Sequence, residues 1–269
     1  MNKLKRVFSF FIFVIILSNI FSFASAVTLS DKTIELEKDL SSEAVLIMES
    51  TTGKIIYEKN GYEKKYPAST TKILTAILAI EHCNLDETAT ASEFAINSIP
   101  SGYSTANIQI GETLSVKDLL YALMLQSANE SAVILAEHVS GSQEAFADLM
   151  NKKAKEIGCE NSHFVNPNGI HNNDHYTTAH DLALISNYAM KNSTFRDIVK
   201  TTSFTLPATS AYPSATRTYI NTNNLLIYDN RNRPDNYYYE YATGIKTGYT
   251  TEAKNCLVSS ATKNGMNFI

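Results

Sequence analysis

The chain has 269 residues, of which 44% are hydrophobic, so it is long enough to bury a substantial core. Its 23 basic and 27 acidic residues give a net charge of −4, which argues against a basic nucleic-acid-binding surface, and no nucleic-acid partner is expected. The three cysteines, Cys83, Cys159 and Cys256, are too few for a disulfide-rich scaffold, and their odd number leaves at least one unpaired.

The N-terminus has the three-part pattern of a secretory signal. Three basic residues within the first six precede an apolar run over residues 7–17, and Ala24-Ser25-Ala26 supplies a small-x-small cleavage site. An uncleaved membrane anchor is the weaker interpretation, because this apolar run is short for a bilayer. We therefore expect residues 1–26 to be removed and residues 27–269 to act outside the cytoplasmic membrane, with a formal charge of 20 − 27 = −7.

The first part of the expected domain is a hairpin followed by a helix. Apolar runs at 43–50 and 55–59 flank a turn that contains Gly53, which predicts two antiparallel strands. Pro67 ends any extended segment, and the apolar spacing from Lys72 to His82 predicts a helix.

A block of helices is predicted next. Ser115-x-x-Asp118 has the pattern of a capping box and leads into an apolar run that Gln126–Asn129 interrupts. The helical pattern resumes from Glu130 until Gly141. Two more helices are predicted, one over about 143–157, stopping at Gly158, and one capped by Thr178 and running to about Lys191.

The pattern then changes to short strands rich in Thr and Tyr. They are predicted at 203–206, 218–221, 243–249 and 255–262, and residues 266–269 have the pattern of a strand that is just starting. Strands, then helices, then strands predict an α+β fold, an antiparallel sheet flanked by helices with a mostly helical inserted subdomain over about 85–200. A domain is not expected to stop within a strand, so we expect the catalytic domain, 27–269, to be truncated at its C-terminal end.

Three short motifs carry the candidate chemistry. Ser69 and Lys72 stand three residues apart where the predicted helix begins, but a second Ser-x-x-Lys at 260–263 shows that this spacing also arises by chance. One Ser-x-Asn, Ser127-Ala128-Asn129, lies where two helical runs break, and one Lys-Thr-Gly, Lys246-Thr247-Gly248, lies in a strand-like segment. In this order, the three motifs are the combination found in penicillin-interacting serine enzymes.

The spacing of the first motif suits a nucleophile and its base. Three residues apart on a helix, Ser69 and Lys72 share a face, so the lysine nitrogen can reach the hydroxyl and take its proton. A lysine acts as a base only if its charged form is disfavoured, and lowering its pKa to about 7 corresponds to roughly 4–5 kcal/mol. Burial and a neighbouring cation both act in this direction, and Lys246 is the candidate cation.

The whole sequence resembles the low-molecular-weight penicillin-binding proteins that act as D-alanyl-D-alanine carboxypeptidases, peptidase family S11. The similar stretches are A-S-T-T-K, L-M-L-Q-S-A-N-E-S-A-V-I-L-A-E-H, F-V-N-P-N-G-I, H-Y-T-T-A-H-D-L-A and T-G-I-K-T-G-Y-T, from about residue 40 to the end. The resemblance implies a secreted enzyme of β-lactamase/transpeptidase-like fold, without metal or organic cofactor. Its substrate would be a peptidoglycan stem peptide ending in D-Ala-D-Ala, and β-lactam antibiotics would acylate it. Such enzymes usually continue into segments that attach to the membrane, so membrane association would depend on segments absent here.

The resemblance also implies a role for each motif residue. The catalytic residues would be the acyl-ester nucleophile Ser69, the general base Lys72 and the proton relay Ser127. The substrate-binding residues would be Asn129, Lys246, Thr247 and Gly248. The oxyanion hole would be formed by the backbone N–H groups of Ser69 and Tyr249.

Three alternatives stay open at this point. A secreted β-lactamase shares the acyl-enzyme step, but class A enzymes use a glutamate for deacylation, and the segment V-N-P-N-G-I-H contains none. A catalytically inactive peptidoglycan-binding module would keep the fold, although the intact motifs argue against this. A metal hydrolase is suggested by a polar cluster but lacks the helical H-E-x-x-H pattern, and the cluster is His163, His171, Asp174, His175 and His180.

Overall fold

The computed structural model describes residues 40–228 and 237–269. Its strands, in chain order, are β1 (Val45–Met48), β2 (Ile55–Lys59), β3 (Thr88–Thr90), β4 (Thr113–Ser115), β5 (Ser203–Leu206), β6 (Arg217–Ile220), β7 (Ala242–Thr250), β8 (Lys254–Lys263) and β9 (Met266–Phe268). Its helices are α2 (Lys72–His82), α3 (Glu93–Asn97), α4 (Val116–Leu125), α5 (Asn129–Ser140), α6 (Gln143–Ile157), α7 (Ala179–Ala189) and α8 (Ser193–Val199), with 3₁₀ turns η1 (Ala68–Thr71) and η2 (Asn224–Leu226).

The predicted secretory signal, residues 1–26, lies outside the described residues, so its removal stays a prediction. In the part of the chain that the structure does describe, no helix combines the length and the apolar character needed to span a bilayer.

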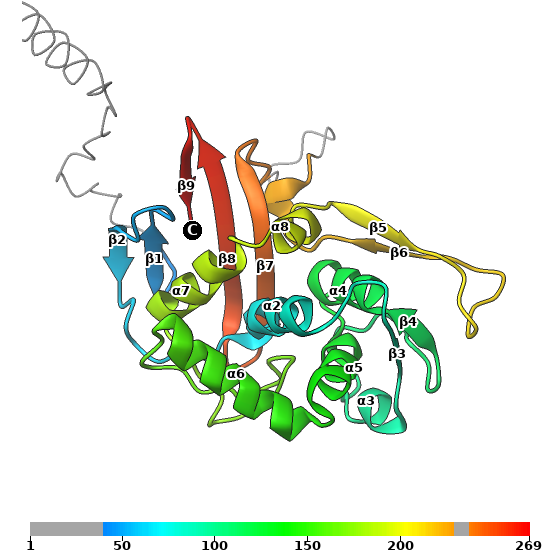
Figure 1. Ribbon diagram of the computed structural model, residues 1–269. Helices are drawn as coiled ribbons and strands as arrows, with labels where there is room; N and C mark the ends of the chain where they lie inside the picture. The colour runs from blue at the N-terminus through cyan, green and yellow to red at the C-terminus, as the bar shows by residue number, and fades with distance from the viewer. Residues whose placement is uncertain (1–39, 229–236) are drawn as a thin grey trace, which may run out of the picture. The chain divides into compact units, whose positions relative to one another are not determined.

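The main sheet is assembled from the two ends of the described chain. β1 and β2 form the predicted antiparallel hairpin, and β7, β8 and β9 form a second antiparallel group. Backbone hydrogen bonds join the two groups where β1 meets the end of β9. Met48 N–H donates to Ile269 O at 2.8 Å, and Ile269 N–H donates to Met48 O at 3.0 Å. The strand order is therefore β2-β1-β9-β8-β7, which leaves β7 at one edge of the sheet (Figure 1).

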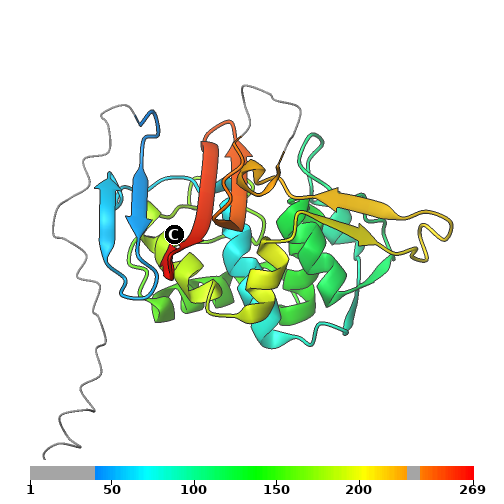
Figure 2. The same ribbon diagram turned by 90° about the horizontal axis from the view of Figure 1, so that it is seen from above.

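Helices pack on one face of this sheet. Figures 1 and 2 show α2 and α7 across β1, β7 and β8, with α6 beyond them and with α4 and α5 beside α2. Helix α2 is surrounded on all sides, and its residues from Lys72 to Ala79 are all buried. A helix that is buried all round needs apolar residues on every face, which explains why Ile, Leu and Ala fill this segment apart from Lys72 and Thr75.

The helix boundaries follow the signals in the sequence. Ser115 Oγ accepts a hydrogen bond from Asp118 N–H at 3.1 Å at the start of α4. Thr178 Oγ1 accepts one from Asp181 N–H at 3.0 Å at the start of α7. Each cap satisfies a backbone donor that has no partner within its own helix. The predicted helix starts are therefore confirmed at both positions.

Several short elements were not predicted. The hairpin β3–β4 and the helices α3 and α8 are three to seven residues long, too short for hydrophobic periodicity to reveal them. The β5 and β6 strands, predicted individually, form a hairpin of their own instead of joining the main sheet (Figure 1). The α+β fold class is confirmed, and the domain limits, including the insertion over 85–200, stay predictions.

Candidate active site

The first motif lies on the turn η1 and the start of α2. Ser69 is in the turn, and Lys72 is the first residue of the helix. Lys72 Nζ donates a hydrogen bond to Ser69 Oγ at 2.9 Å. Ala68, directly before the serine, has a φ of +48°, a left-handed conformation that costs a residue with a side chain about 1–3 kcal/mol and occurs most often at functional sites.

Lys72 is buried completely among polar partners. Besides Ser69, its Nζ donates to Asn129 Oδ1 at 2.9 Å and to the Asn168 carbonyl at 2.6 Å. Burial, and then the positive charge of Lys246, hold the pKa of Lys72 well below its ordinary value, and the nearby Glu130 acts in the opposite direction. The three partners therefore aim the amine at the serine, while its surroundings favour the neutral form.

The second motif lies at the sharp break between α4 and α5. Ser127 is buried and has a φ of +61°, the second left-handed residue of the site. Asn129 begins α5, and its Nδ2 donates to the Ser104 carbonyl at 2.9 Å, as its backbone N–H does at 3.1 Å. These two bonds fix the orientation of the Asn129 amide, so that its oxygen faces Lys72.

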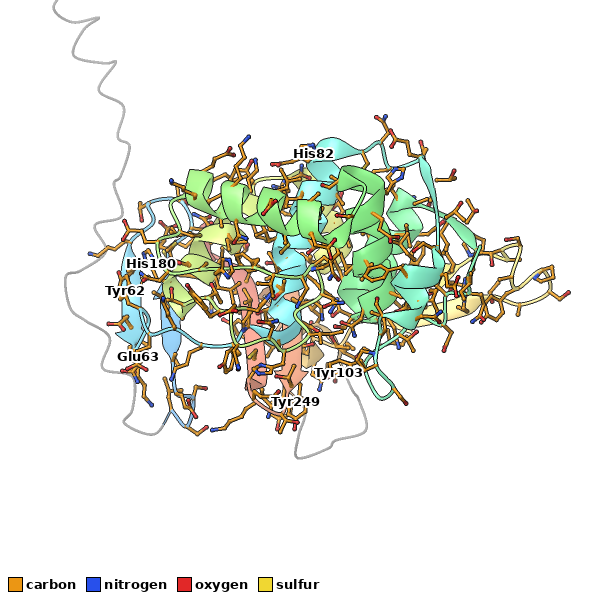
Figure 3. The ribbon with its side chains drawn as sticks, turned by 90° about the horizontal axis from the view of Figure 1, so that it is seen from below. Tyr62, Glu63, His82, Tyr103, His180 and Tyr249 are labelled. Atoms are coloured by element: carbon orange, nitrogen blue, oxygen red, sulfur yellow. The ribbon has the colours of Figure 1, made fainter. Side chains whose placement is uncertain are left out.

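The third motif lies on the edge strand β7. Lys246 is buried, which lowers its pKa to about 7, and its Nζ donates to the Thr247 carbonyl at 3.0 Å. Thr247 Oγ1 shares a hydrogen bond of 2.6 Å with Thr222 Oγ1. Tyr249 is 65% exposed, and Figure 3 shows it on the same side of the molecule as Tyr103, the neighbour of Ser104.

Gly248 is the point where the strand meets the serine turn. A Cβ at this position would lie 3.0 Å from the Ser69 backbone nitrogen, 3.2 Å from the Ala68 Cβ and 3.2 Å from the Pro67 carbonyl oxygen. The glycine therefore allows β7 to lie directly against η1, a packing reason that adds to the predicted contact with substrate. The close approach brings the first and third motifs to one place.

The second Ser-x-x-Lys, by contrast, lies within strand β8. Ser260 is buried and its Oγ shares a hydrogen bond of 2.8 Å with Thr243 Oγ1. Successive residues of a strand alternate between its two faces, so a spacing of three puts Ser260 and Lys263 on opposite faces. Spacing alone therefore does not make an active-site pair.

Three further polar residues complete the site, of which Asn168 and Glu130 were given no role from the sequence and His175 was considered only as a candidate metal ligand. The carbonyl of Asn168 holds Lys72, and the Glu130 carboxylate is buried beside it, with Oε1 accepting from Ala106 N–H at 2.7 Å. His175 supports the serine turn through a 2.8 Å hydrogen bond between its Nε2 and Thr71 Oγ1. Asn168 and His175 lie in stretches that carried the family resemblance, and Glu130 directly follows Ser-x-Asn, so the signal for each was present.

The histidine cluster does not have the geometry of a metal site. His175 Nδ1 accepts a hydrogen bond from Val165 N–H at 3.1 Å, so both of its ring nitrogens are engaged. His163 Nδ1 contacts the Asp174 carbonyl instead, at 2.5 Å. Within residues 40–228 and 237–269, no group of three potential metal ligands includes any of these histidines.

Taken together, the site combines a serine hydroxyl, a buried lysine of lowered pKa and a second buried lysine. A neutral lysine that takes the serine proton activates the hydroxyl for attack on a carbonyl carbon. The three motifs, on an antiparallel sheet flanked by helices, define the class of penicillin-interacting serine enzymes.

Comparisons with known proteins identify the family within this class. The family model described as D-alanyl-D-alanine carboxypeptidase, peptidase S11, matches residues 31–269, and the chain belongs to this family. The D-alanyl-D-alanine carboxypeptidase DacF of Bacillus subtilis (strain 168) is 36% identical over 243 residues, which cover 88% of this chain and 58% of DacF. The D-alanyl-D-alanine carboxypeptidase of Streptomyces sp. (strain K15) is 38% identical over 236 residues, which cover 82% of this chain and 77% of the relative.

A solved structure agrees with these relatives. The crystal structure of the Streptomyces K15 DD-transpeptidase has a TM-score of 0.76 with this chain at 34% sequence identity. The match covers 87% of this chain and 90% of that one. This chain therefore spans nearly all of the Streptomyces structure but only a little over half of the Bacillus relative.

Proposed function

We propose that the chain is a serine D-Ala-D-Ala carboxypeptidase that removes the terminal D-alanine from peptidoglycan stem peptides. The observation that carries the proposal is the completely buried Lys72, whose Nζ lies 2.9 Å from Ser69 Oγ and whose pKa is held well below its ordinary value. Family membership supplies the reaction, since the family is described by this activity.

The reaction divides into two steps at Ser69. In acylation, Ser69 Oγ bonds to the carbonyl carbon of the penultimate D-alanine while its proton passes to Lys72. The C–N bond then breaks, and the terminal D-alanine leaves as an amine that takes up this proton through Ser127. In deacylation, a water molecule attacks the same carbonyl carbon, the C–O bond breaks and Ser69 regains its proton.

The remaining motif residues hold the substrate in this proposal. Asn129 binds the peptide backbone, and Lys246 and Thr247 bind the terminal carboxylate, for which a buried cation is well suited. The backbone N–H groups of Ser69 and Tyr249 stabilise the oxyanion, and a donor of this kind is worth about 3–4 kcal/mol in the transition state.

β-Lactam antibiotics are the proposed covalent inhibitors, because they imitate D-Ala-D-Ala and acylate the same serine. The segment around Asn168 does not favour the β-lactamase alternative. Its contacts with α2 are made by backbone carbonyls and not by a glutamate: Pro167 O accepts from Thr75 Oγ1 at 2.6 Å, and Asn168 O accepts from Lys72. A class A enzyme needs a glutamate to activate the deacylating water.

The location that goes with this activity is outside the cytoplasmic membrane, at the cell wall. The N-terminal pattern of residues 1–26 supports secretion, and the substrate class lies outside the cytoplasm.

Intact-protein mass spectrometry after incubation with benzylpenicillin tests the proposal. We expect the wild-type chain to gain one stable adduct, Ser69→Ala to gain none, and Ser260→Ala, in the second Ser-x-x-Lys copy, to acylate like wild type. Released D-alanine from a D-Ala-D-Ala peptide should follow the same pattern. Adduct on folded Ser69→Ala would refute the role of Ser69, and an adduct that hydrolyses within seconds would favour a β-lactamase.

A further inference from the structure

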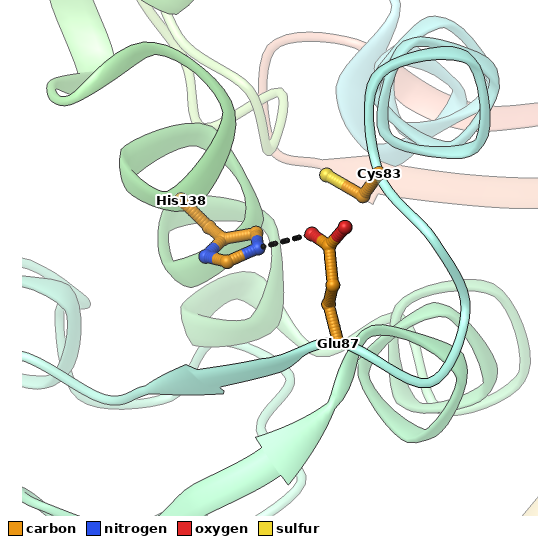
Figure 4. Close-up of side chains that lie close together, drawn as sticks. All are labelled: Cys83, Glu87 and His138. Carbon is orange, nitrogen blue, oxygen red and sulfur yellow. Dashed lines mark hydrogen bonds and ion pairs between the residues drawn. The ribbon is translucent and has the colours of Figure 1, made fainter.

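Three side chains with metal-binding atoms converge on the surface away from the candidate active site. They are Cys83, Glu87 and His138, whose sulfur, carboxylate oxygen and ring nitrogen all lie within 4.8 Å of one another (Figure 4). Glu87 Oε2 and His138 Nε2 are 3.2 Å apart. Within the described parts of the chain, this is the one group of three such ligands.

Each of the three comes from a backbone segment that is held in place. Cys83 caps the C-terminal end of α2 and its N–H donates to the Ala79 carbonyl at 3.0 Å. The Glu87 carbonyl accepts from Val116 N–H at 2.8 Å, directly before β3. His138 lies in the last turn of α5. The backbone positions that carry the three ligands are therefore tied to the fold by hydrogen bonds.

The carboxylate of Glu87 is oriented by a neighbour. Asn84 donates to its Oε1 twice, from the backbone N–H at 3.1 Å and from the side-chain Nδ2 at 2.7 Å. The other oxygen, Oε2, faces His138, and the carboxylate lies within 4.8 Å of the Cys83 sulfur. Outer hydrogen bonds of this kind are typical of ligands in metal sites, where they fix the direction of the donor atom.

We propose that Cys83, Glu87 and His138 bind one Zn²⁺ ion. A thiolate, an imidazole nitrogen and a carboxylate oxygen are the three donor types that Zn²⁺ takes in proteins, and three protein ligands leave a fourth position for water. The thiolate favours Zn²⁺ over Mg²⁺ and Ca²⁺, which prefer oxygen ligands alone. On binding, Cys83 releases its thiol proton to solvent, and the proton on His138 Nε2 is lost to solvent or replaced by one on Nδ1. The Glu87–His138 hydrogen bond is then replaced by two bonds to the metal.

The place of the cluster suggests what the metal would do. Helices α2 and α5 both begin at the candidate active site, where Lys72 and Asn129 share a 2.9 Å hydrogen bond, and both end at the cluster. Figure 3 shows His82, the last residue of α2, on the opposite side of the molecule from Tyr249. The metal would therefore tie together the far ends of two helices that carry motif residues at their near ends, and stabilise the folded chain.

Titration with Co²⁺ under reducing conditions, followed by competition with Zn²⁺, tests the site directly. We expect one Co²⁺ per chain, with a thiolate-to-cobalt absorption band that Zn²⁺ abolishes, and a higher melting temperature with Zn²⁺. Cys83→Ser should remove the band. His138→Ala removes a ligand, so it should weaken binding at least 100-fold, which is roughly the largest effect of losing a hydrogen bond to a ligand. Asn84→Ala should weaken it about 10–100-fold.

Two control variants separate this site from general metal binding. Cys159→Ser removes a thiol elsewhere, and His82→Ala removes a neighbouring exposed histidine, so both should bind like wild type. Absence of the cobalt band in folded wild type would overturn the proposal, as would a band that survives in Cys83→Ser. Penicillin acylation of each variant is measured separately, so failure of the metal site is distinguishable from failure of the proposed enzyme activity.

Discussion

At the residue scale, two buried lysines should control how activity depends on pH. The proposed reaction would need Lys72 neutral, to take the serine proton, and Lys246 protonated, to bind a carboxylate. Burial and the charge of Lys246 lower the pKa of Lys72, and burial lowers that of Lys246 to about 7. Acylation should therefore rise with pH as Lys72 loses its proton and decline above about pH 7 as Lys246 loses its own.

Lys246→Gln tests this coupling between the two lysines. Removing the positive charge should raise the pKa of Lys72 and move the rising part of the acylation profile to higher pH. Lys72→Met should instead remove the rising part of the profile and lower the rate about 10²–10⁴-fold at the pH values where Lys72 of the wild type is neutral, because the base itself is lost. Benzylpenicillin acylation rates over a pH series measure both effects, with exposed Lys117→Gln as the control. An unchanged rising part in Lys246→Gln would contradict the coupling.

At the element scale, the position of η1 depends on close contacts with the loop before α7 and with β7. A Cβ at Gly169 would lie 1.9 Å from the Ala68 carbonyl oxygen, and one at Gly248 would lie 3.0 Å from the Ser69 nitrogen. Real Cβ atoms do not approach a backbone oxygen this closely, so the turn would have to move. The serine turn is thus contacted on both sides, by a glycine that excludes any side chain at Gly169 and by one that leaves little room for a Cβ at Gly248.

Gly169→Ala and Gly53→Ala form a matched pair that separates this crowding from backbone strain. Their φ values are similar, +81° and +72°, but nothing lies within 4 Å of a Cβ at Gly53. Gly53→Ala should cost about 1 kcal/mol of stability and leave acylation unchanged. Gly169→Ala should cost at least about 2 kcal/mol more and slow acylation, because the serine turn shifts. Urea unfolding and acylation rates measure both effects, and equal losses in the pair would show that crowding is unimportant.

At the scale of the whole molecule, a buried histidine links folding to pH. Burial, reinforced by the charges of His163, His171 and Lys72, lowers the pKa of His175 from 6.5 to about 3. Between these values the unfolded chain binds a proton that the folded chain does not, so stability is present above about pH 6.5 and is lost as the pH falls toward 3.

The expected loss is about 2 kcal/mol between pH 7 and pH 5 from this residue alone. His175→Gln, which keeps a hydrogen-bonding side chain without the titration, should be less stable at pH 7 but should lose less on acidification. Urea unfolding at the two pH values measures the difference, with exposed His82→Gln as the control. If wild type and His175→Gln lose equal stability on acidification, the histidine does not carry this pH dependence.

The sequence alone determined the local structure and the identity of the motif residues. Helix caps such as Ser115 and Thr178, and the apolar run of α2, depend on neighbours within a few residues, so they can be predicted without the fold. The Ser-x-x-Lys, Ser-x-Asn and Lys-Thr-Gly motifs were recognisable for the same reason, since each is a short segment of fixed spacing. Their order along the chain was read from the sequence as well, and the family resemblance then implied a role for each residue.

Only the tertiary structure decided which distant groups meet. It joined β9 to β1 in one sheet, brought the Asn168 carbonyl and the Glu130 carboxylate to Lys72, and gathered Cys83 with His138 at the far end of α2 and α5. It also separated the two Ser-x-x-Lys copies, because a helix start puts Ser69 beside Lys72 whereas a strand puts Ser260 and Lys263 on opposite faces. Such contacts depend on packing between elements far apart in the chain, and local spacing carries no information about which elements will pack together.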